Sequence, residues 1–250
     1  MYSVKPYARL ASQYDWIMRH VDYPGWANYL KTLIDKHALP LDCVLELATG
    51  TGSFAKAGLF SGAKKLVVSD LSPHMLGEAI KGQKNPLPLV HNALHTPFKK
   101  GTFSSVWMLY DSLNYLPGEQ ALISFFSELK GIVKPGGYFV ADITTALNSQ
   151  RYFADFLDWE ENEHCSMIRQ SSFEASQRLQ INNFVLFFKE SNGHYTRFEE
   201  QHVQYIFPWK EMVKMAQKSG WEHIAAYQNQ SLEPAKSTAE RVHLVWKCPS

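Results

Sequence analysis

The chain has few cysteines, and their positions exclude two common kinds of scaffold. Cys43, Cys165 and Cys248 form an odd, widely spaced set without a CxxC pair. Such a set fits reduced thiols, and it provides neither a disulfide framework nor a cysteine zinc site. Histidine, aspartate and glutamate are also not grouped at ligand spacing, and Glu160–His164 fits a solvated strand edge better. We therefore expect no bound metal.

The chain also lacks an excess of charge and a long apolar run. Its 25 basic and 24 acidic residues give a net charge of +1, and its lysines and arginines are scattered. This balance disfavours nucleic acid as a partner. No segment approaches the roughly 20 apolar residues that cross a bilayer, and Met1–Tyr7 contains no apolar signal core. We expect a cytoplasmic protein with no membrane contact.

The most informative segment of the sequence is VLELATGTGSFA at residues 44–55, an apolar strand followed by a glycine-rich turn and a helix start. Gly50 and Gly52 lack a Cβ, so the backbone there can adopt positive φ and approach a ligand closely. The free N–H groups of the following helix attract polar or negative groups. The segment therefore predicts a cofactor-binding turn.

The residues around this turn leave two cofactors open. The spacing G-x-G-x-x-A also fits a dinucleotide fingerprint, and Asp70 ends a second strand where a carboxylate can bind both ribose hydroxyls. Asp70 would serve NAD and S-adenosylmethionine (SAM) equally well. Glu46 favours SAM, because dinucleotide strands are usually apolar at that position and its carboxylate could hold the loop or an ammonium group.

Several segments in order resemble the class I SAM-dependent methyltransferases. They are VLELATGTGSFA, VVSDLSPHML, VHNALHTPF, FSSVWMLYDSLNYL and ELKGIVKPGGYFVADI, which together cover roughly residues 40–145. The N-terminal Tyr7-x-x-Leu10-Ala11-x-x-Tyr14-Asp15 and the segment DSLNYL at residues 111–116 resemble the branch that acts on small molecules, which includes glycine and amino-sugar N-methyltransferases. The resemblance implies SAM as cofactor and S-adenosylhomocysteine as product.

The resemblance also implies a set of cofactor-binding residues. They are Tyr14, Glu46, Ala48, Gly50, Gly52, Asp70, Leu71, Met75, Asn92, Ala93 and Leu109. Asn92 stands where many relatives have aspartate, and its amide oxygen can still accept a hydrogen bond from the adenine amino group. Thr49 replaces a common cysteine and Ser104 a common aspartate, and neither change removes a group that the chemistry requires.

The order of strands and helices predicts an α/β fold, which the resemblance specifies as a Rossmann-like seven-stranded sheet with helices on both faces. We expect helices at residues 8–37, broken at Pro24-Gly25, at 73–81 with Ser72 as N-cap, and at 118–133. A glycine turn at residues 134–137 leads into a strand. Strands at 221–227 and 239–248 would end the sheet with an antiparallel strand, unlike an NAD-binding half.

Residues 150–208 depart from the alternating pattern. Residues 159–173, 178–190 and 195–207 each read as strands, with a turn at Ser191–His194. We predict that they form a small antiparallel β lid, inserted in a core made of residues 1–149, with an N-terminal helical cap, and 209–250. Because ligands bind outside the carboxyl ends of parallel strands, this insertion is the predicted selector of the acceptor.

Tyr14, Asp111 and His202 are the candidates for lining the transfer point. Each has a structural alternative: aromatic packing for Tyr14, a helix N-cap for Asp111, and hydrogen bonding within the lid for His202. Asp111 and His202, with Tyr195 and Arg197, are also the candidates for binding the acceptor, although pairing with glutamates is the alternative for the last two.

The sequence thus predicts transfer of a methyl group from SAM to a small-molecule amine or hydroxyl by in-line displacement. Three alternatives stay open: an RNA-modifying methyltransferase with a basic patch near Lys99-Lys100, an NAD-dependent oxidoreductase, and a non-catalytic SAM-binding protein. The sequence identifies neither the acceptor nor the oligomeric state.

Overall fold

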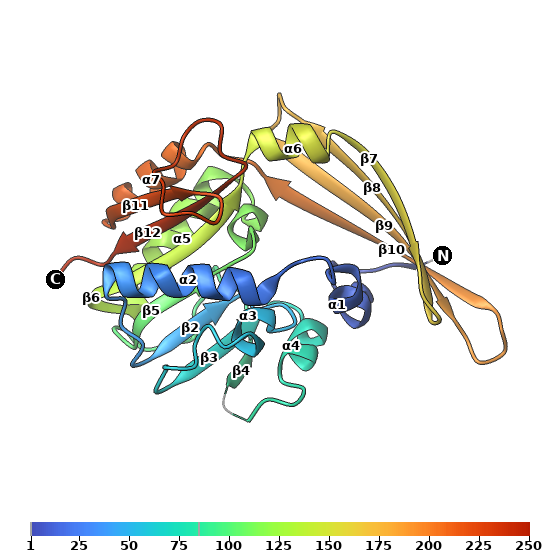
Figure 1. The fold of residues 1–250 in the computed structure, drawn as a ribbon, viewed down its shortest axis with the longest axis horizontal. Helices are drawn as coiled ribbons and strands as arrows, with labels where there is room; N and C mark the ends of the chain where they lie inside the picture. The colour runs from blue at the N-terminus through green and yellow to red at the C-terminus, as the bar shows by residue number, and fades with distance from the viewer. Residues whose placement is uncertain (1, 85) are drawn as a thin grey trace.

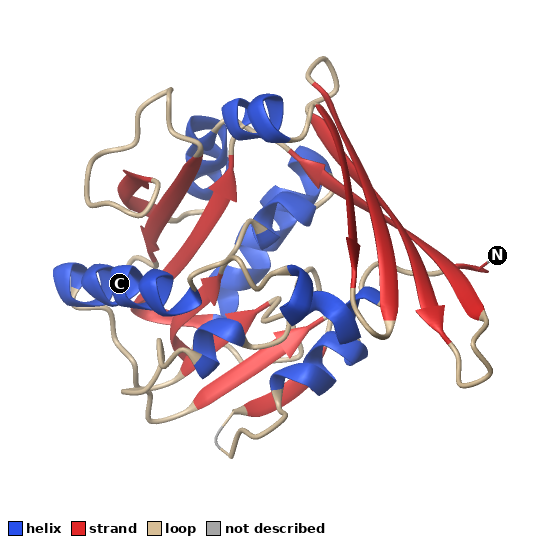
Figure 2. Ribbon diagram, turned by 45° about the vertical axis from the view of Figure 1, so that its right-hand side comes forward, coloured by secondary structure: helices blue, strands red, loops and turns tan. Residues whose placement is uncertain are grey.

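The computed structural model describes residues 2–84 and 86–250 and contains two β-sheets. We call them the core sheet, with seven strands, and the outer sheet, with five. They lie on opposite sides of the short helix α1 (Tyr14–Ile17) (Figure 1). Helices surround the core sheet, as the view in Figure 2 shows.

The core sheet has the strand order β11-β12-β6-β5-β2-β3-β4. Strand β12 runs antiparallel to both of its neighbours, β11 and β6, whereas the pairs from β6 to β4 are parallel, so the terminal pair ends the sheet as predicted. The seven-stranded Rossmann-like sheet predicted from the sequence is confirmed. The strands are β2 (Val44–Leu47), β3 (Leu66–Asp70), β4 (Leu87–Val90), β5 (Phe103–Met108), β6 (Val133–Thr144), β11 (Glu222–Gln228) and β12 (Arg241–Lys247).

Two hydrophobic clusters cover the two faces of this sheet. One contains buried side chains of α5 (Gly118–Ile132) and α7 (Trp209–Lys218), and the other contains buried side chains of α2 (Tyr23–His37) and α3 (Ser53–Lys56). Strands β2 and β5 are buried along their whole length, as expected of parallel strands covered on both faces. The carboxyl ends of β2, β3 and β5 are thereby fixed side by side at one edge.

Local signals placed two helices correctly. Helix α4 (Pro73–Ala79) begins after Ser72, whose hydroxyl accepts a hydrogen bond from the Met75 N–H, with Pro73 in the first turn. Helix α5 begins at Gly118 and ends at Ile132, close to the predicted 118–133. The predicted turn at 134–137 is instead the start of β6, where Gly136 has φ +76°.

The N-terminal helical region differs from the prediction at its break. The break lies between α1 and α2, and Pro24-Gly25 belongs to the first turn of α2. Asp22 caps this helix and accepts a hydrogen bond from the Gly25 N–H at 2.9 Å. Proline is tolerated in a first helical turn because its missing N–H would have no partner there. A 3₁₀ turn, η1 (Leu10–Gln13), precedes α1.

The outer sheet contains one strand more from residues 150–208 than predicted. The predicted strand at 159–173 is two strands, β7 (Asp155–Glu161) and β8 (Cys165–Glu174). They are separated by a turn in which the Asn162 side chain accepts from the N–H groups of His164 and Cys165, both at 2.9 Å. An asparagine turn of this kind reverses a strand without glycine or proline. Strands β9 (Leu179–Lys189) and β10 (Tyr195–Tyr205) match the other two predictions, and α6 (Ala146–Tyr152) leads into the sheet.

The N-terminal segment joins the outer sheet, which the sequence did not predict. Strand β1 (Tyr2–Ser3) pairs in parallel with β10, so the sheet order is β1-β10-β9-β8-β7. This pairing ties residues before α1 to the inserted strands. Within residues 2–84 and 86–250, no helix is both long and apolar enough to span a membrane.

Candidate active site

A cavity of about 1190 Å³ opens at the carboxyl ends of β2, β3 and β5. Residues 46–51, 69–75, 91–94 and 108–112 line it from the core, and the N-terminal segment and the outer sheet line the rest. The volume suits more than one small ligand. Twelve of the predicted site residues line it: Tyr14, Glu46, Ala48, Gly50, Asp70, Leu71, Met75, Asn92, Ala93, Leu109, Asp111 and His202.

Three predicted site residues lie elsewhere. Gly52 has φ +76° and faces α4, where an added Cβ would lie 3.1 Å from the Ala79 Cβ. Glycine is needed there for helix packing, and its predicted contact with the cofactor stays a prediction. Tyr195 is 49% exposed at the start of β10, and Arg197 forms an ion pair with Glu199 on the same strand. Neither is among the described residues that line the cavity, and their predicted contact with the acceptor stays a prediction.

The glycine turn is held by the carboxylate of Asp70. Gly50 has φ +57°, and its N–H donates to Asp70 Oδ2 at 2.9 Å. The other oxygen, Oδ1, accepts from the Ser72 N–H at 2.8 Å. Burial raises the pKa of Asp70, and the hydrogen bonds from Ser72 and Gly50 act against that rise. Asp70 therefore joins the turns after β2 and β3 at the edge of the cavity, besides any contact that it makes with a ligand.

Glu46 brings an unpartnered carboxylate oxygen to the same turn. Its side chain is buried, and Oε2 accepts from the Thr49 hydroxyl at 2.8 Å. Among the described residues, Oε1 has no hydrogen-bond partner. Burial raises the pKa of Glu46 to about 7, and Asp70 contributes to this rise. A cationic ligand group beside Oε1 would supply the missing partner.

The side-chain oxygen of Asn92 is engaged locally. Asn92 Oδ1 accepts from the Leu94 N–H at 3.0 Å, so it forms a turn after β4. The predicted partner of this oxygen is the adenine amino group. Because the Leu94 N–H already uses one lone pair of the oxygen, only the second lone pair can accept from adenine.

Asp111 belongs to a charged cluster that the sequence analysis did not foresee. Asp111 Oδ1 lies 2.7 Å from an Arg241 nitrogen, and the Gln204 side chain donates to Oδ2. Arg241 also pairs with Asp142, which accepts from the backbone N–H groups of Tyr110 at 2.6 Å and Asp111 at 3.0 Å. Burial alone would lower the pKa of Arg241, but the two carboxylates raise it, so the guanidinium stays charged. The Asp111 carboxylate is therefore engaged by Arg241 and is not a free base.

The helix-cap alternative for Asp111 is also corrected. Asp111 precedes the 3₁₀ turn η2 (Ser112–Tyr115), but its side chain makes no capping hydrogen bond. Tyr110 and Asp111 have φ of +57° and +51°, a conformation that costs energy for residues other than glycine. The bonds to Asp142 hold this strained backbone in place.

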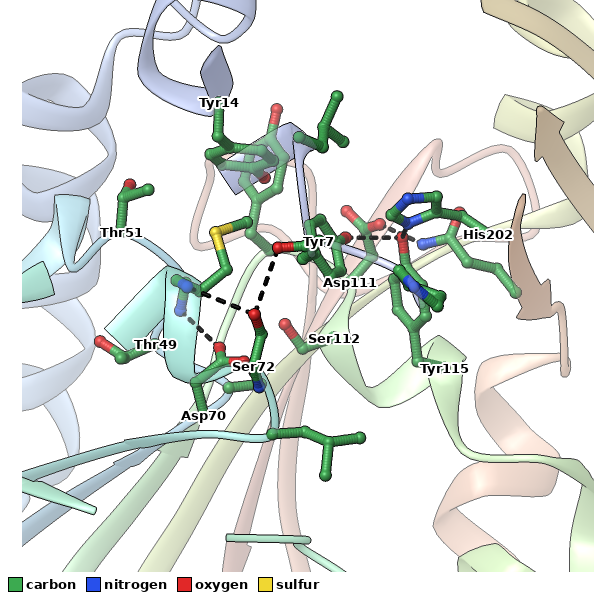
Figure 3. Close-up of a pocket in the computed structure, with 18 of the residues that line it drawn as sticks. Tyr7, Tyr14, Thr49, Thr51, Asp70, Ser72, Asp111, Ser112, Tyr115 and His202 are labelled. Carbon is green, nitrogen blue, oxygen red and sulfur yellow. Dashed lines mark hydrogen bonds between the residues drawn. The ribbon is translucent and has the colours of Figure 1, made fainter. Parts of the chain in front are cut away.

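A second polar cluster joins the N-terminal segment to the outer sheet (Figure 3). Glu200 accepts from the backbone N–H groups of Tyr7 at 2.6 Å, Arg9 at 2.7 Å and Leu10 at 3.0 Å. The His202 ring lies 4.5 Å from the Tyr7 ring, centroid to centroid. The contact of Glu200 with Tyr7 was not predicted, because no local pattern links residues so far apart.

Tyr14 lines the cavity beside Tyr7. Its ring meets the Tyr7 ring edge-on, with centroids 5.9 Å apart, and burial raises the pKa of its phenol well above the ordinary value. The phenol is therefore neutral and can act only through hydrogen bonds and packing. Among residues 2–84 and 86–250, no group of three metal-ligating side chains is placed to hold a metal ion.

The residues at the glycine turn fit SAM. The unpartnered Glu46 oxygen suits an ammonium group, and an added Cβ at Gly50 would meet nothing within 4 Å, which leaves room for a ligand against the backbone. Asp70 lies at the end of the neighbouring strand, where it can accept from ribose hydroxyls.

Comparison with known proteins agrees with this fit. Residues 44–137 match the family described as methyltransferase domain. The chain is 28% identical over 221 residues to YqeM of Bacillus subtilis, provisionally named a methyltransferase, with 86% of each chain covered. A SAM-dependent methyltransferase of Clostridium acetobutylicum superposes with a TM-score of 0.82 at 22% identity, covering 98% of this chain and 99% of that one.

A further solved structure, the sugar N-methyltransferase KedS8 of Streptoalloteichus, superposes with a TM-score of 0.75 at 16% identity and covers 94% of this chain and 92% of its own. At these identities the structures establish the fold. The match at residues 44–137 establishes the domain, and the NAD alternative falls away. The protein therefore carries a methyltransferase domain and has the fold of the class I SAM-dependent methyltransferases.

Proposed function

We propose that the protein transfers the methyl group of SAM to a small-molecule acceptor through an amine or hydroxyl of that acceptor. The observation that carries this proposal is the shared cavity: the glycine turn lines it at one end, and the outer sheet lines it at the other. One cavity can thus hold donor and acceptor in contact. Holding the reacting groups in line can supply several kcal/mol of the rate enhancement.

Each cofactor contact in this proposal follows from a residue's place in the cavity. Asp70 would bind the ribose hydroxyls, Asn92 and Ala93 would face the adenine, and Glu46 would accept from the ammonium group. Tyr14 would lie near the methionine end. SAM supplies an activated methyl group on sulfur, and the protein's part is to bind, orient and exclude water.

The position of the basic patch favours a small acceptor over RNA. Lys99 and Lys100 are exposed and precede β5, whereas the cavity residues 108–112 follow it. The lysine pair therefore lies at the amino end of β5, whereas the cavity lies at its carboxyl end. The sugar N-methyltransferase KedS8 shares the fold, which supports a small acceptor without identifying it.

We also infer that residues 150–208 act as a lid that selects the acceptor. The inward side chains of β9 and β10, including Asn182, Phe184 and His202, line the cavity. They belong to the outer sheet, whereas the glycine turn follows a strand of the core sheet. Residues of this segment should therefore affect the acceptor more than SAM.

Two measurements test the proposed function. SAM and S-adenosylhomocysteine should bind and raise the melting temperature, whereas NAD should not. Incubation with SAM and a panel of amino acids, amino sugars and simple phenols should then yield S-adenosylhomocysteine and a product heavier by a methyl group. Tighter binding of NAD than of SAM, or methylation of transfer RNA without any small acceptor, would contradict the proposal.

A further inference from the structure

Four side chains form a continuous hydrogen-bonded chain from the cavity into the outer sheet. The Tyr7 and Tyr115 hydroxyl oxygens are 2.8 Å apart, and the Tyr115 oxygen lies 3.4 Å from His202 Nδ1. His202 Nε2 lies 3.2 Å from Glu200 Oε2. Figure 3 shows Tyr7, Tyr115 and His202 following one another along the cavity wall. The side chains of His202 and Glu200 are almost fully buried, at 2% and 0% exposure.

The direction of these hydrogen bonds follows from Glu200. Burial alone would raise its pKa, but hydrogen bonds from His202 and from the Arg9 and Leu10 N–H groups lower it, so the carboxylate is ionised. An ionised carboxylate can only accept, so His202 Nε2 carries a hydrogen. In the neutral imidazole Nδ1 is then the unprotonated nitrogen, which accepts from Tyr115, whose oxygen in turn accepts from Tyr7.

The hydrogen-bonded chain therefore ends at the cavity in the Tyr7 oxygen. This oxygen can accept a hydrogen bond from the acceptor and can take the acceptor's proton as it gives up its own. Burial raises the pKa of Tyr7 and of Tyr115, so neither phenol holds a negative charge. Each can pass its proton on as it receives another. The proton can come to rest on His202, where the resulting imidazolium would face the Glu200 carboxylate.

We propose that Tyr7, Tyr115, His202 and Glu200 form a proton relay that removes the acceptor's proton during methyl transfer. This proposal rests on the proposed function. As the acceptor's nitrogen or oxygen bonds to the methyl carbon and the carbon–sulfur bond breaks, the acceptor's proton passes to the Tyr7 oxygen. The Tyr7 proton passes to Tyr115, and the Tyr115 proton passes to His202 Nδ1. The positive charge of the sulfonium is thereby replaced by that of the imidazolium.

The relay defines the class of acceptor and separates two kinds of role. An acceptor that uses the relay must carry a removable proton, as neutral primary and secondary amines and hydroxyls do, and tertiary amines do not. Tyr7 is the catalytic residue that meets the acceptor. Glu200 is a positioning residue, because it fixes the His202 tautomer and holds the N-terminal segment that carries Tyr7.

The tautomer of His202 gives a direct test. The ionisable groups facing it are Glu200 on its own strand, Tyr7 on the N-terminal segment and Tyr115 on η2, with Asp111 further along; Phe184 of β9 packs against it without charge. We would record nitrogen NMR spectra of histidine-labelled protein bound to S-adenosylhomocysteine and assign His202 by the signal lost in His202→Gln. The relay requires hydrogen on Nε2 and none on Nδ1 at neutral pH.

Glu200→Gln replaces the ionised acceptor of the Nε2 hydrogen by a neutral amide, so the Nε2 signal of His202 should shift. Glu199→Gln is the matched control, because Glu199 lies on the opposite face of β10 and pairs with Arg197; it should leave that signal unchanged. A hydrogen on Nδ1 in the wild type, or the same Nε2 signal in Glu200→Gln and the wild type, would overturn the relay. If Glu200→Gln fails to fold, Tyr115→Phe decides, because it must shift the Nδ1 signal.

Turnover separates failure of the relay from failure of the proposed function. With the best amine or phenol of the panel, Tyr115→Phe should lower turnover about 100-fold or more while S-adenosylhomocysteine affinity stays within a few-fold. Wild-type turnover in Tyr115→Phe would overturn the relay and leave the proposed function standing. If wild-type protein methylates nothing in the panel, the proposed function fails, and the NMR arm still decides the relay.

Discussion

The two ends of the cavity are built over very different distances in the sequence. At the glycine turn, the hydrogen bonds of Glu46 to Thr49 and of Gly50 to Asp70 span 3 and 20 residues. At the outer sheet, Glu200 holds Tyr7 across 193 residues, and Tyr115 meets His202 across 87. The first end depends on adjacent strands of one sheet, and the second depends on closure of the whole fold.

The buried acids at the two ends of the cavity also differ in their hydrogen bonding. Glu46 at the glycine turn has one oxygen without a partner among the residues that the structure describes, so it can accept from a cation. Glu200 and Asp111, towards the outer sheet, are fully engaged by protein donors. We therefore expect changes at the glycine turn to act on SAM, and changes near the outer sheet to act on folding or on the acceptor.

The largest effect on SAM should come from Gly50→Val. A β-branched side chain at φ +57° strains the backbone and projects into the cavity, so SAM binding should be lost in a folded protein. Gly101→Val is the matched control: Gly101 has φ +60°, open space around its Cβ and no place in the cavity wall. Calorimetry should show SAM binding lost in the first variant and kept in the second. Normal binding by Gly50→Val would mean that this turn does not hold SAM.

Arg241→Met should have the largest effect on stability. It leaves the carboxylates of Asp111 and Asp142 buried without their cation, which costs about 3–5 kcal/mol. The exposed pair of Arg178 and Glu211 provides the control, because Arg178→Met should cost less than about 1 kcal/mol. Urea unfolding measures both. Equal losses in the two variants would show that the buried cluster does not stabilise the strained turn.

Glu46→Gln should change how stability depends on pH. The folded-state pKa of Glu46 is about 7, above the ordinary 4.5, so the folded protein binds this proton more tightly than the unfolded chain. Glu46 therefore lowers stability as pH rises from about 4.5 to about 7. A pKa difference of about 2.5 corresponds to about 3 kcal/mol.

Glutamine cannot ionise, so Glu46→Gln should be more stable than wild type near pH 8 and similar near pH 4. Urea unfolding at several pH values checks this.

Glu200 affects the pH dependence of stability in the opposite direction. Its pKa is lowered, so its stabilisation is present at neutral pH and lost as pH falls through its folded pKa. A wild-type pH profile in Glu46→Gln would remove the contrast between the two acids.

The smallest effect should come from Tyr195→Ala, although Tyr195 and His202 share strand β10. Tyr195 is half exposed and outside the cavity wall, so its loss should leave SAM affinity and turnover near wild type. His202→Ala should reduce turnover. A loss of turnover in Tyr195→Ala would restore the contact with the acceptor that the sequence analysis predicted.

The same contrast explains what the sequence could predict. The core sheet and the glycine turn follow from short apolar segments, Gly50 and Asp70, whose relations are local. The two polar clusters near the outer sheet could not be predicted, because the contacts of Tyr7, Glu200 and Arg241 exist only after distant segments meet. The packing of Gly52 against α4 was not predicted, since spacing alone does not show what a glycine faces. The additional strand was missed because its turn depends on one side chain, Asn162.

The SAM dissociation constants of two alanine variants test the division of the cavity most directly. Asp70→Ala removes a charged acceptor worth roughly 1.5–3 kcal/mol, so affinity should fall about ten- to a hundredfold. His202→Ala should stay within a few-fold of wild type. Calorimetry on both folded variants would support the account if only Asp70→Ala loses affinity. It would contradict the account if His202→Ala abolished SAM binding or if Asp70→Ala bound SAM as wild type does.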